Sequence, residues 1–95
     1  MFYINVWLTV NDPQNVERVR DLLTQCVRGS RAEDGCIRFD AFHSEADPRR
    51  FLLVENWRSK ADWEEHRTRK TVQEIYLPQV IPLVTRDAHM CSLVE

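Results

Sequence analysis

The chain has 95 residues, of which 43% are hydrophobic and 29% are charged, and its formal net charge is −2 at pH 7. This length suits one domain over residues 1–95, and the composition is ordinary for a soluble globular protein. The interleaved charges argue against nucleic-acid binding by phosphate neutralisation. No apolar run approaches the roughly 20 residues that a membrane-spanning helix needs, which argues against a membrane protein.

The three cysteines, Cys26, Cys36 and Cys91, are scattered along the chain. They form no Cys-x-x-Cys pair, and no cluster of cysteine and histidine has zinc-ligand spacing. Isolated cysteines are typical of reduced core residues in cytosolic proteins. Met1 is followed by neither a charged segment nor the cleavage site of a signal peptide. We therefore expect a cytoplasmic protein without a metal site.

The chain begins with the pattern of a strand followed by a helix. Residues 2–10 alternate between an aliphatic row and a second row that contains Tyr3 and Trp7. Asp12-Pro13 then offers an N-cap and a proline at the first helical position. Apolar residues at helical spacing predict a helix over residues 13–29.

Two strands that form a hairpin are expected next. Residues 33–35 form a turn, and residues 36–44 alternate like a second strand. Asp47-Pro48 marks the hairpin loop, and residues 51–57 form a third strand. This third strand is apolar on both of its faces.

The last third of the chain predicts a helix and a closing strand. Ser59 is an N-cap, and the inner face of the helix presents Trp63 and His66. The helical face continues until Pro78 and Pro82, which are expected to break it. Residues 89–94 form the expected closing strand.

The resulting order, β-α-β-β-α-β, is the ferredoxin-like split motif of an α+β fold. Its two helices cover only one face of the sheet. The other face is not polar, because it carries Tyr3 and Trp7 of the first strand and an apolar row of the third. Strands that are apolar on both faces are usually covered on both. We therefore expect a homodimer whose two sheets pack face to face into an α/β barrel.

One carboxylate, Glu55, lies within the apolar third strand, where a charge is costly without a partner. The nearest candidate partner is His66, which titrates near neutral pH. If both side chains line one apolar pocket, the chain has a proton-handling site that needs no metal and no bound cofactor. The alternative is a structural ion pair between Glu55 and an arginine such as Arg58 or Arg38.

A series of short motifs runs in a fixed order along nearly the whole chain: Glu33-x-Gly35-Cys36, Phe39, Asp47-Pro48, Phe51, Glu55-x-Trp57, Ala61 and His66. In this order and spacing they resemble the antibiotic biosynthesis monooxygenase family. The resemblance implies a dimeric ferredoxin-like barrel, with small-molecule chemistry in a pocket between each sheet and its helices.

Members of this family catalyse several reactions, and the quinol monooxygenases resemble this chain most, through Glu55-x-Trp57 and His66. Their helix carries a second histidine, which is absent here, where residues 68–71 read Thr-Arg-Lys-Thr. The haem-degrading members have a tryptophan at the position of His66, so haem degradation is not expected. Other relatives tailor polyketides or process a phosphorylated signalling sugar.

Oxygenation without a cofactor requires an electron-rich substrate, such as a phenol or hydroquinone, that can reduce triplet dioxygen once it is deprotonated. The protein must supply a base, an apolar pocket and hydrogen-bond donors. The leading hypothesis is a cofactor-independent monooxygenase that acts with dioxygen on a quinol-like or polyphenolic aromatic compound, with Glu55 and His66 handling protons. The expected substrate-binding residues are Asn5, Trp7, Phe39, Trp57 and Trp63. The alternatives are an isomerase of a carbonyl compound or phosphorylated sugar that uses the same two residues, and a non-catalytic dimeric ligand-binding module.

Overall fold

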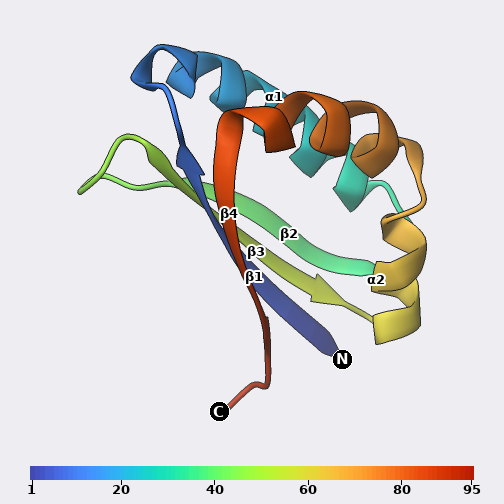
Figure 1. Ribbon diagram of the computed structural model, residues 1–95. Helices are drawn as coiled ribbons and strands as arrows, with labels where there is room; N and C mark the ends of the chain where they lie inside the picture. Colours follow the sequence, from blue (N-terminus) through green and yellow to red (C-terminus); the bar gives the residue numbers. More distant parts are fainter.

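Four antiparallel strands form one sheet in the computed structural model, which describes residues 1–95 (Figure 1). The strands, in the spatial order β2-β3-β1-β4, are β1 (Phe2–Val10), β2 (Cys36–His43), β3 (Arg50–Trp57) and β4 (Val84–Cys91). The helices are α1 (Val16–Arg31), α2 (Lys60–His66) and a π-helix, η2 (Thr71–Val80), with short 3₁₀ turns at Pro13–Asn15 and Ile81–Leu83. This order confirms the predicted α+β ferredoxin-like fold.

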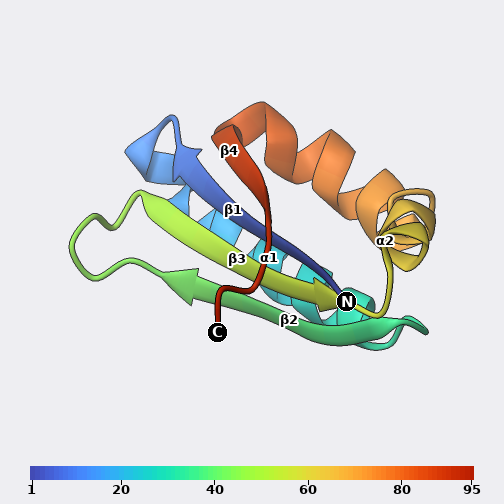
Figure 2. The same cartoon turned by 90° about the horizontal axis from the view of Figure 1, so that it is seen from below.

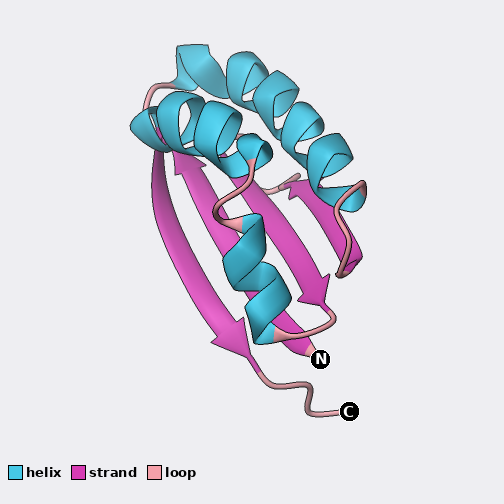
Figure 3. Ribbon diagram, turned by 90° about the vertical axis from the view of Figure 1, so that its right-hand side faces the viewer, coloured by secondary structure: helices cyan, strands magenta, loops and turns pink.

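The helices all lie on one face of the sheet. α1 and η2 run side by side across that face, and α2 connects the end of β3 to η2 (Figures 1 and 3). None of these helices is both long enough and apolar enough to cross a membrane. No helix covers the opposite face, which Figure 2 shows from below.

The core lies between the sheet and α1 and follows from the period of each element. In β1 every second residue is buried beneath the helices: Ile4, Val6, Leu8 and Val10. The apolar stripe of α1 packs onto this row with Val19, Leu22, Leu23, Cys26 and Val27. In β3 the inward row consists of Phe51, Leu53, Glu55 and Trp57, so Glu55 is the one carboxylate in the sheet's buried face.

The uncovered face of the sheet is partly apolar. It carries Tyr3, Asn5 and Trp7 of β1 beside Leu52 and Val54 of β3, all half-buried within the single chain. The guanidinium of Arg50 lies 4.3 Å above the Trp7 ring and covers part of it.

The closing strand begins earlier in the chain than predicted. β4 runs from Val84 to Cys91 rather than over residues 89–94, and it pairs with β1 along its whole length. It was missed because Thr85, Arg86 and Asp87 are polar and exposed on this edge strand, which removes the alternation that marks a half-buried strand.

Pro78 does not break the last helix, contrary to the prediction, whereas the helix does end before Pro82, the second predicted break. The chain breaks earlier, after α2, and η2 continues through Pro78 to Val80. In this π-helix the Ile81 N–H bonds to the Tyr76 carbonyl, five residues back. Proline has no N–H for a bond to residue i−5 either, so η2 passes through Pro78 with one backbone hydrogen bond fewer than an uninterrupted π-helix.

Gly35, in the turn before β2, has a φ of 89°, a backbone conformation that favours glycine. Stability should therefore be sensitive to substitution at this position. A β-carbon there would lie 2.7 Å from Cγ of Asp62, at the start of α2. We expect Gly35→Ala to lower the free energy of unfolding by about 1–3 kcal/mol, measured by urea denaturation. The control, Glu45→Ala in the exposed β2–β3 loop, should change it by less than about 0.5 kcal/mol. Equal effects of the two substitutions would contradict this reading of the turn.

Candidate active site between the sheet and the helices

A cavity of about 730 Å³ lies between the inner face of the sheet, α2 and η2. Its wall is largely apolar and contains a few polar groups, as in small-molecule sites. The lining side chains that carry the argument below are Ser30, Phe39, Glu55, Trp63, His66, Tyr76 and Arg86.

Glu55 reaches the cavity from the middle of β3. The strand register places Ile4 and Phe39 on either side of it, and its side chain is only 6% exposed. The Trp57 indole N–H donates a 3.0 Å hydrogen bond to its Oε1. Burial raises the pKa of Glu55 to about 7. The Trp57 hydrogen bond and the more distant charge of Arg86 lower this pKa, but the effect of burial is larger. The carboxyl is thus poised to exchange a proton near neutral pH.

No arginine forms an ion pair with Glu55, so the alternative that Glu55 belongs to a structural ion pair with Arg58 or Arg38 is wrong. Arg58 is engaged by Asp62 and Asp34, and Arg38 by Asp40.

His66 ends α2 and is buried on the same cavity wall. Its Nδ1 lies 2.9 Å from Oε1 of Glu33, which corrects the expected pairing with Glu55. Because a carboxylate only accepts, Nδ1 carries the proton and the neutral ring keeps a lone pair on Nε2. Nε2 has no hydrogen-bond partner within the chain. The ring centroid lies 4.4 Å from that of Trp57 and 5.9 Å from that of Phe39, and these two rings also contact each other.

The pKa of His66 is lowered because burial of the ring outweighs the hydrogen bond and charge of Glu33. A lowered pKa keeps the imidazole neutral around pH 7. With one nitrogen held by a carboxylate and the other free, the ring has the arrangement of a general base.

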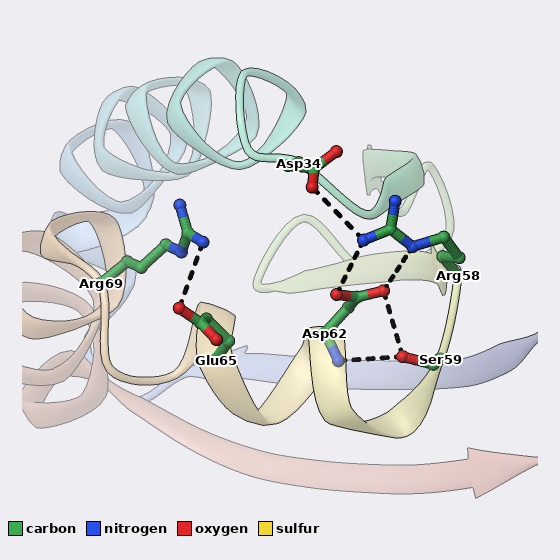
Figure 4. A network of polar contacts seen from close by, with 6 residues as sticks. All are labelled: Asp34, Arg58, Ser59, Asp62, Glu65 and Arg69. Atoms are coloured by element: carbon green, nitrogen blue, oxygen red, sulfur yellow. Dashed lines mark hydrogen bonds and ion pairs between the residues drawn. The ribbon is translucent and has the colours of Figure 1, made fainter.

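A polar network at the start of α2 holds this helix in place (Figure 4). The Ser59 hydroxyl accepts the Asp62 backbone N–H and donates to its carboxylate. Arg58 donates to Asp62 and also to Asp34, in the turn that carries Glu33. The network therefore ties the turn that bears Glu33 to the helix that bears His66, although 33 residues separate the pair in sequence.

The other predicted substrate-binding residues divide into two groups. Phe39 and Trp63 line the cavity. Trp57 does not, contrary to the prediction, because its side chain is fully buried, where it bonds to Glu55 and contacts the ring of His66. Asn5 and Trp7, in contrast, lie on the opposite face of the sheet, where the Asn5 amide donates to Cys91 Sγ. Placing Asn5 and Trp7 in this pocket was wrong, because their row alternates with the inward Ile4 row.

Four lining or neighbouring groups were missed at the sequence level. They are Glu33, Ser30, Tyr76 and Arg86. The Tyr76 hydroxyl accepts a 2.9 Å hydrogen bond from Arg86 Nε. The Ser30 hydroxyl and Oε2 of Glu33 are buried without a partner in the chain. The structure contains no group of three or more His, Cys, Asp or Glu side chains that could hold a metal ion.

The Glu33–His66 pair gives a direct prediction. Because the Glu33 carboxylate raises the pKa of His66, Glu33→Gln should lower it further, which ¹⁵N NMR titration of the ring nitrogens measures. The control is Glu65→Gln, an exposed residue on the same helix that pairs only with Arg69. A His66 pKa that is unchanged, or that rises, in Glu33→Gln would contradict the pairing.

Comparisons with known proteins agree with this architecture. A model of the family described as antibiotic biosynthesis monooxygenase matches residues 1–76. A Mycobacterium tuberculosis protein named "Putative monooxygenase Rv0793" is 36% identical over 81 residues, which cover 85% of this chain and 78% of that protein. Its solved structure has a TM-score of 0.87 at 25% identity and covers 100% of this chain and 97% of that one. A crystal structure described as an antibiotic biosynthesis monooxygenase has a TM-score of 0.91 at 20% identity, with 100% of both chains covered.

Proposed function

The chain belongs to the antibiotic biosynthesis monooxygenase family, and on this basis we propose that it oxidises a quinol-like or polyphenolic small molecule with dioxygen and without a cofactor. The observation that supports this most is that His66, with a free Nε2, and Glu55, with a pKa of about 7, line one cavity. A neutral base and a second group that can hold or release a proton are what the reaction of a phenol with dioxygen requires from a protein.

In the proposed reaction, Nε2 of His66 removes the proton of a substrate hydroxyl, and Glu33 stabilises the resulting imidazolium. The phenolate transfers electrons to dioxygen, and a ring carbon forms a bond to oxygen. Protonated Glu55 then gives its proton to the outer peroxide oxygen. When the O–O bond breaks, this oxygen leaves as hydroxide and takes the proton held by the His66 imidazolium, which makes water, while the ring carbon forms a carbonyl and gives up its hydrogen as a proton to the Glu55 carboxylate. A hydroquinone supplies all four electrons itself, so that hydroquinone and O₂ yield hydroxyquinone and H₂O.

Side chains of the cavity wall would stabilise the negative charge of the proposed intermediate. Arg86 contributes a positive charge, and its hydrogen bond to Tyr76 holds the two side chains together. Phe39 and Trp63 offer flat apolar surfaces for an aromatic ring.

We also propose that the protein works as a homodimer in which the uncovered sheet faces pack together. Tyr3, Trp7, Leu52 and Val54 form an apolar surface that no helix covers. Trp7→Glu should produce a monomer at micromolar concentration, whereas Arg18→Glu on the helical side should leave a dimer, as measured by sedimentation velocity. A wild-type monomer at these concentrations would contradict the proposal.

We also propose a location in the cytoplasm. The three cysteines form no disulfide, which is consistent with a reducing compartment.

The same two groups also suit a second candidate function. A neutral imidazole and a carboxyl with a pKa of about 7 can move a proton between carbon atoms next to a carbonyl, which is the chemistry of an isomerase.

Oxygen uptake with a panel of hydroquinones, in flavin-free buffer treated with chelator, separates the candidates. Monooxygenation predicts protein-dependent uptake that His66→Gln lowers by about 10²–10⁴-fold, with one water formed for each O₂ consumed. Substrate turnover that persists unchanged under nitrogen would favour the isomerase. If the protein causes neither oxygen uptake nor anaerobic turnover with any substrate, the result favours a ligand-binding module.

A further inference from the structure

A reaction that passes through a phenolate depends on hydrogen-bond donors aimed at the charged oxygen. Several donors of the chain cannot take this part. Asn5, expected among the substrate-binding residues, lies on the opposite face of the sheet. The Trp57 indole N–H donates to Glu55. The Thr68 hydroxyl, on the cavity wall, donates to the Glu65 carbonyl. These three donors are therefore not available to a substrate.

Tyr76 carries a donor that is available. It lines the cavity from η2 and is half-buried. Its hydroxyl oxygen accepts the 2.9 Å hydrogen bond from Nε of Arg86. Because arginine only donates, this bond leaves the Tyr76 proton unused, and the hydroxyl donates to no other group of the chain. The hydroxyl is thus held through its oxygen and can donate to a molecule in the cavity.

The electrostatic surroundings of Tyr76 suit a donor to an anion. Arg86 forms no ion pair, so its positive charge is not neutralised within the chain. Burial raises the pKa of Tyr76, and this effect exceeds the lowering by the charge and hydrogen bond of Arg86, so the hydroxyl keeps its proton around pH 7. The charge of Glu55 also raises this pKa, which shows that the hydroxyl lies within electrostatic reach of the carboxyl.

We propose that Tyr76 is a catalytic residue whose hydroxyl donates a hydrogen bond to the phenolate oxygen of the substrate, and that Arg86 is the residue that positions it. This assignment rests on the proposed function, because His66 forms the phenolate in that reaction. A hydrogen bond to a charged acceptor is stronger than one to a neutral acceptor. Tyr76 therefore stabilises the ionised substrate more than the neutral one and favours proton removal by His66.

The test uses 4-nitrophenol, which is neutral at pH 5, mostly ionised at pH 8 and too poor in electrons to reduce dioxygen. Its dissociation constant is measured by isothermal titration calorimetry at both pH values. Tyr76→Phe should weaken binding of the ionised probe at least about tenfold and binding of the neutral probe by less than about threefold. Each comparison is made between variant and wild type at one pH, so the titration of Glu55 and His66 is common to both proteins.

Three further variants test the specificity of the effect. Tyr3→Phe makes the same chemical change on the opposite face of the sheet and should alter neither dissociation constant. Trp63→Phe removes an indole N–H from the cavity wall and should weaken both forms of the probe alike. Arg86→Gln should weaken the ionised probe. Combined with Tyr76→Phe, it should weaken the probe by less than the product of the two single effects, because Arg86 acts partly through Tyr76.

The proposal is overturned if Tyr76→Phe weakens both forms equally, if Trp63→Phe has the selective effect instead, or if the wild type binds neither form. Independent effects of Tyr76→Phe and Arg86→Gln would overturn the positioning role of Arg86.

Oxygen uptake with hydroquinone separates these outcomes from failure of the proposed function. Uptake that depends on His66 but is unchanged in Tyr76→Phe overturns the assignment of Tyr76 alone. Selective binding of ionised 4-nitrophenol without any oxygen uptake overturns the oxidation and leaves Tyr76 as a donor to bound phenolates.

Discussion

Replacing His66 with glutamine is expected to lower kcat/KM for hydroquinone oxidation by about 10²–10⁴-fold, the usual contribution of a general base. Glutamine keeps a donor that can reach Glu33 but offers the cavity no group that takes up a proton near pH 7. The rate of oxygen uptake, measured against hydroquinone concentration, gives the ratio of the two kcat/KM values.

The matched control uses another histidine of the same chain. His89 is exposed on β4 and pairs only with Asp87, so His89→Gln should leave kcat/KM within about twofold of wild type. If His66→Gln also retains the wild-type value and the wild-type fold, His66 is not the base, and the proposed mechanism is wrong.

The second large effect concerns Glu55 and the dependence of stability on pH. The carboxyl has a pKa of about 7 in the folded chain and about 4.5 when exposed, so the folded state binds the proton more tightly. The stabilisation is therefore fully present below pH 4.5 and is lost as pH rises through 7. At 1.36 kcal/mol per pKa unit, the difference of about 2.5 units corresponds to about 3 kcal/mol.

Glu55→Gln removes this titration while keeping an oxygen that can accept the Trp57 indole N–H. The free energy of unfolding of each protein is measured by urea denaturation at pH 5 and at pH 8. From pH 5 to pH 8, the value for the variant should rise by about 2–3 kcal/mol relative to the value for the wild type. The opposite contribution of His66, whose pKa is lowered, is present in both proteins and cancels in the difference. The control is the exposed Glu65, since Glu65→Gln should show no such rise. A wild-type protein that gains stability over Glu55→Gln between pH 5 and pH 8 would contradict the account.

The parts of the fold that were predicted correctly are those in which one residue period dominates. β1 alternates cleanly and α1 carries a continuous apolar stripe. The reason is that in each element one face is buried in the core and the other is less buried. β4 begins five residues before its predicted start, because an edge strand with polar, exposed side chains carries no such period. The passage of η2 through Pro78 was not predictable from local rules, which assume an α-helix.

The candidate site could be predicted only to the level of single side chains. A carboxylate in an apolar strand identified Glu55, and its buried position on the cavity wall follows from strand alternation. The contact between His66 and Glu33 depends on how a turn and a distant helix are tied together by Arg58, which no spacing reveals. The misplacement of Asn5 has a simpler origin, since the alternation of β1 already separates it from the inward row.

The most direct test of the account is turnover of a hydroquinone under ¹⁸O₂ in flavin-free buffer treated with chelator, with the product reduced at once and weighed by mass spectrometry. We predict one ¹⁸O atom in each product molecule formed by the wild-type protein and no labelled product above background with His66→Gln. Product that carries oxygen from water instead, or equal labelling with and without the protein, would contradict it.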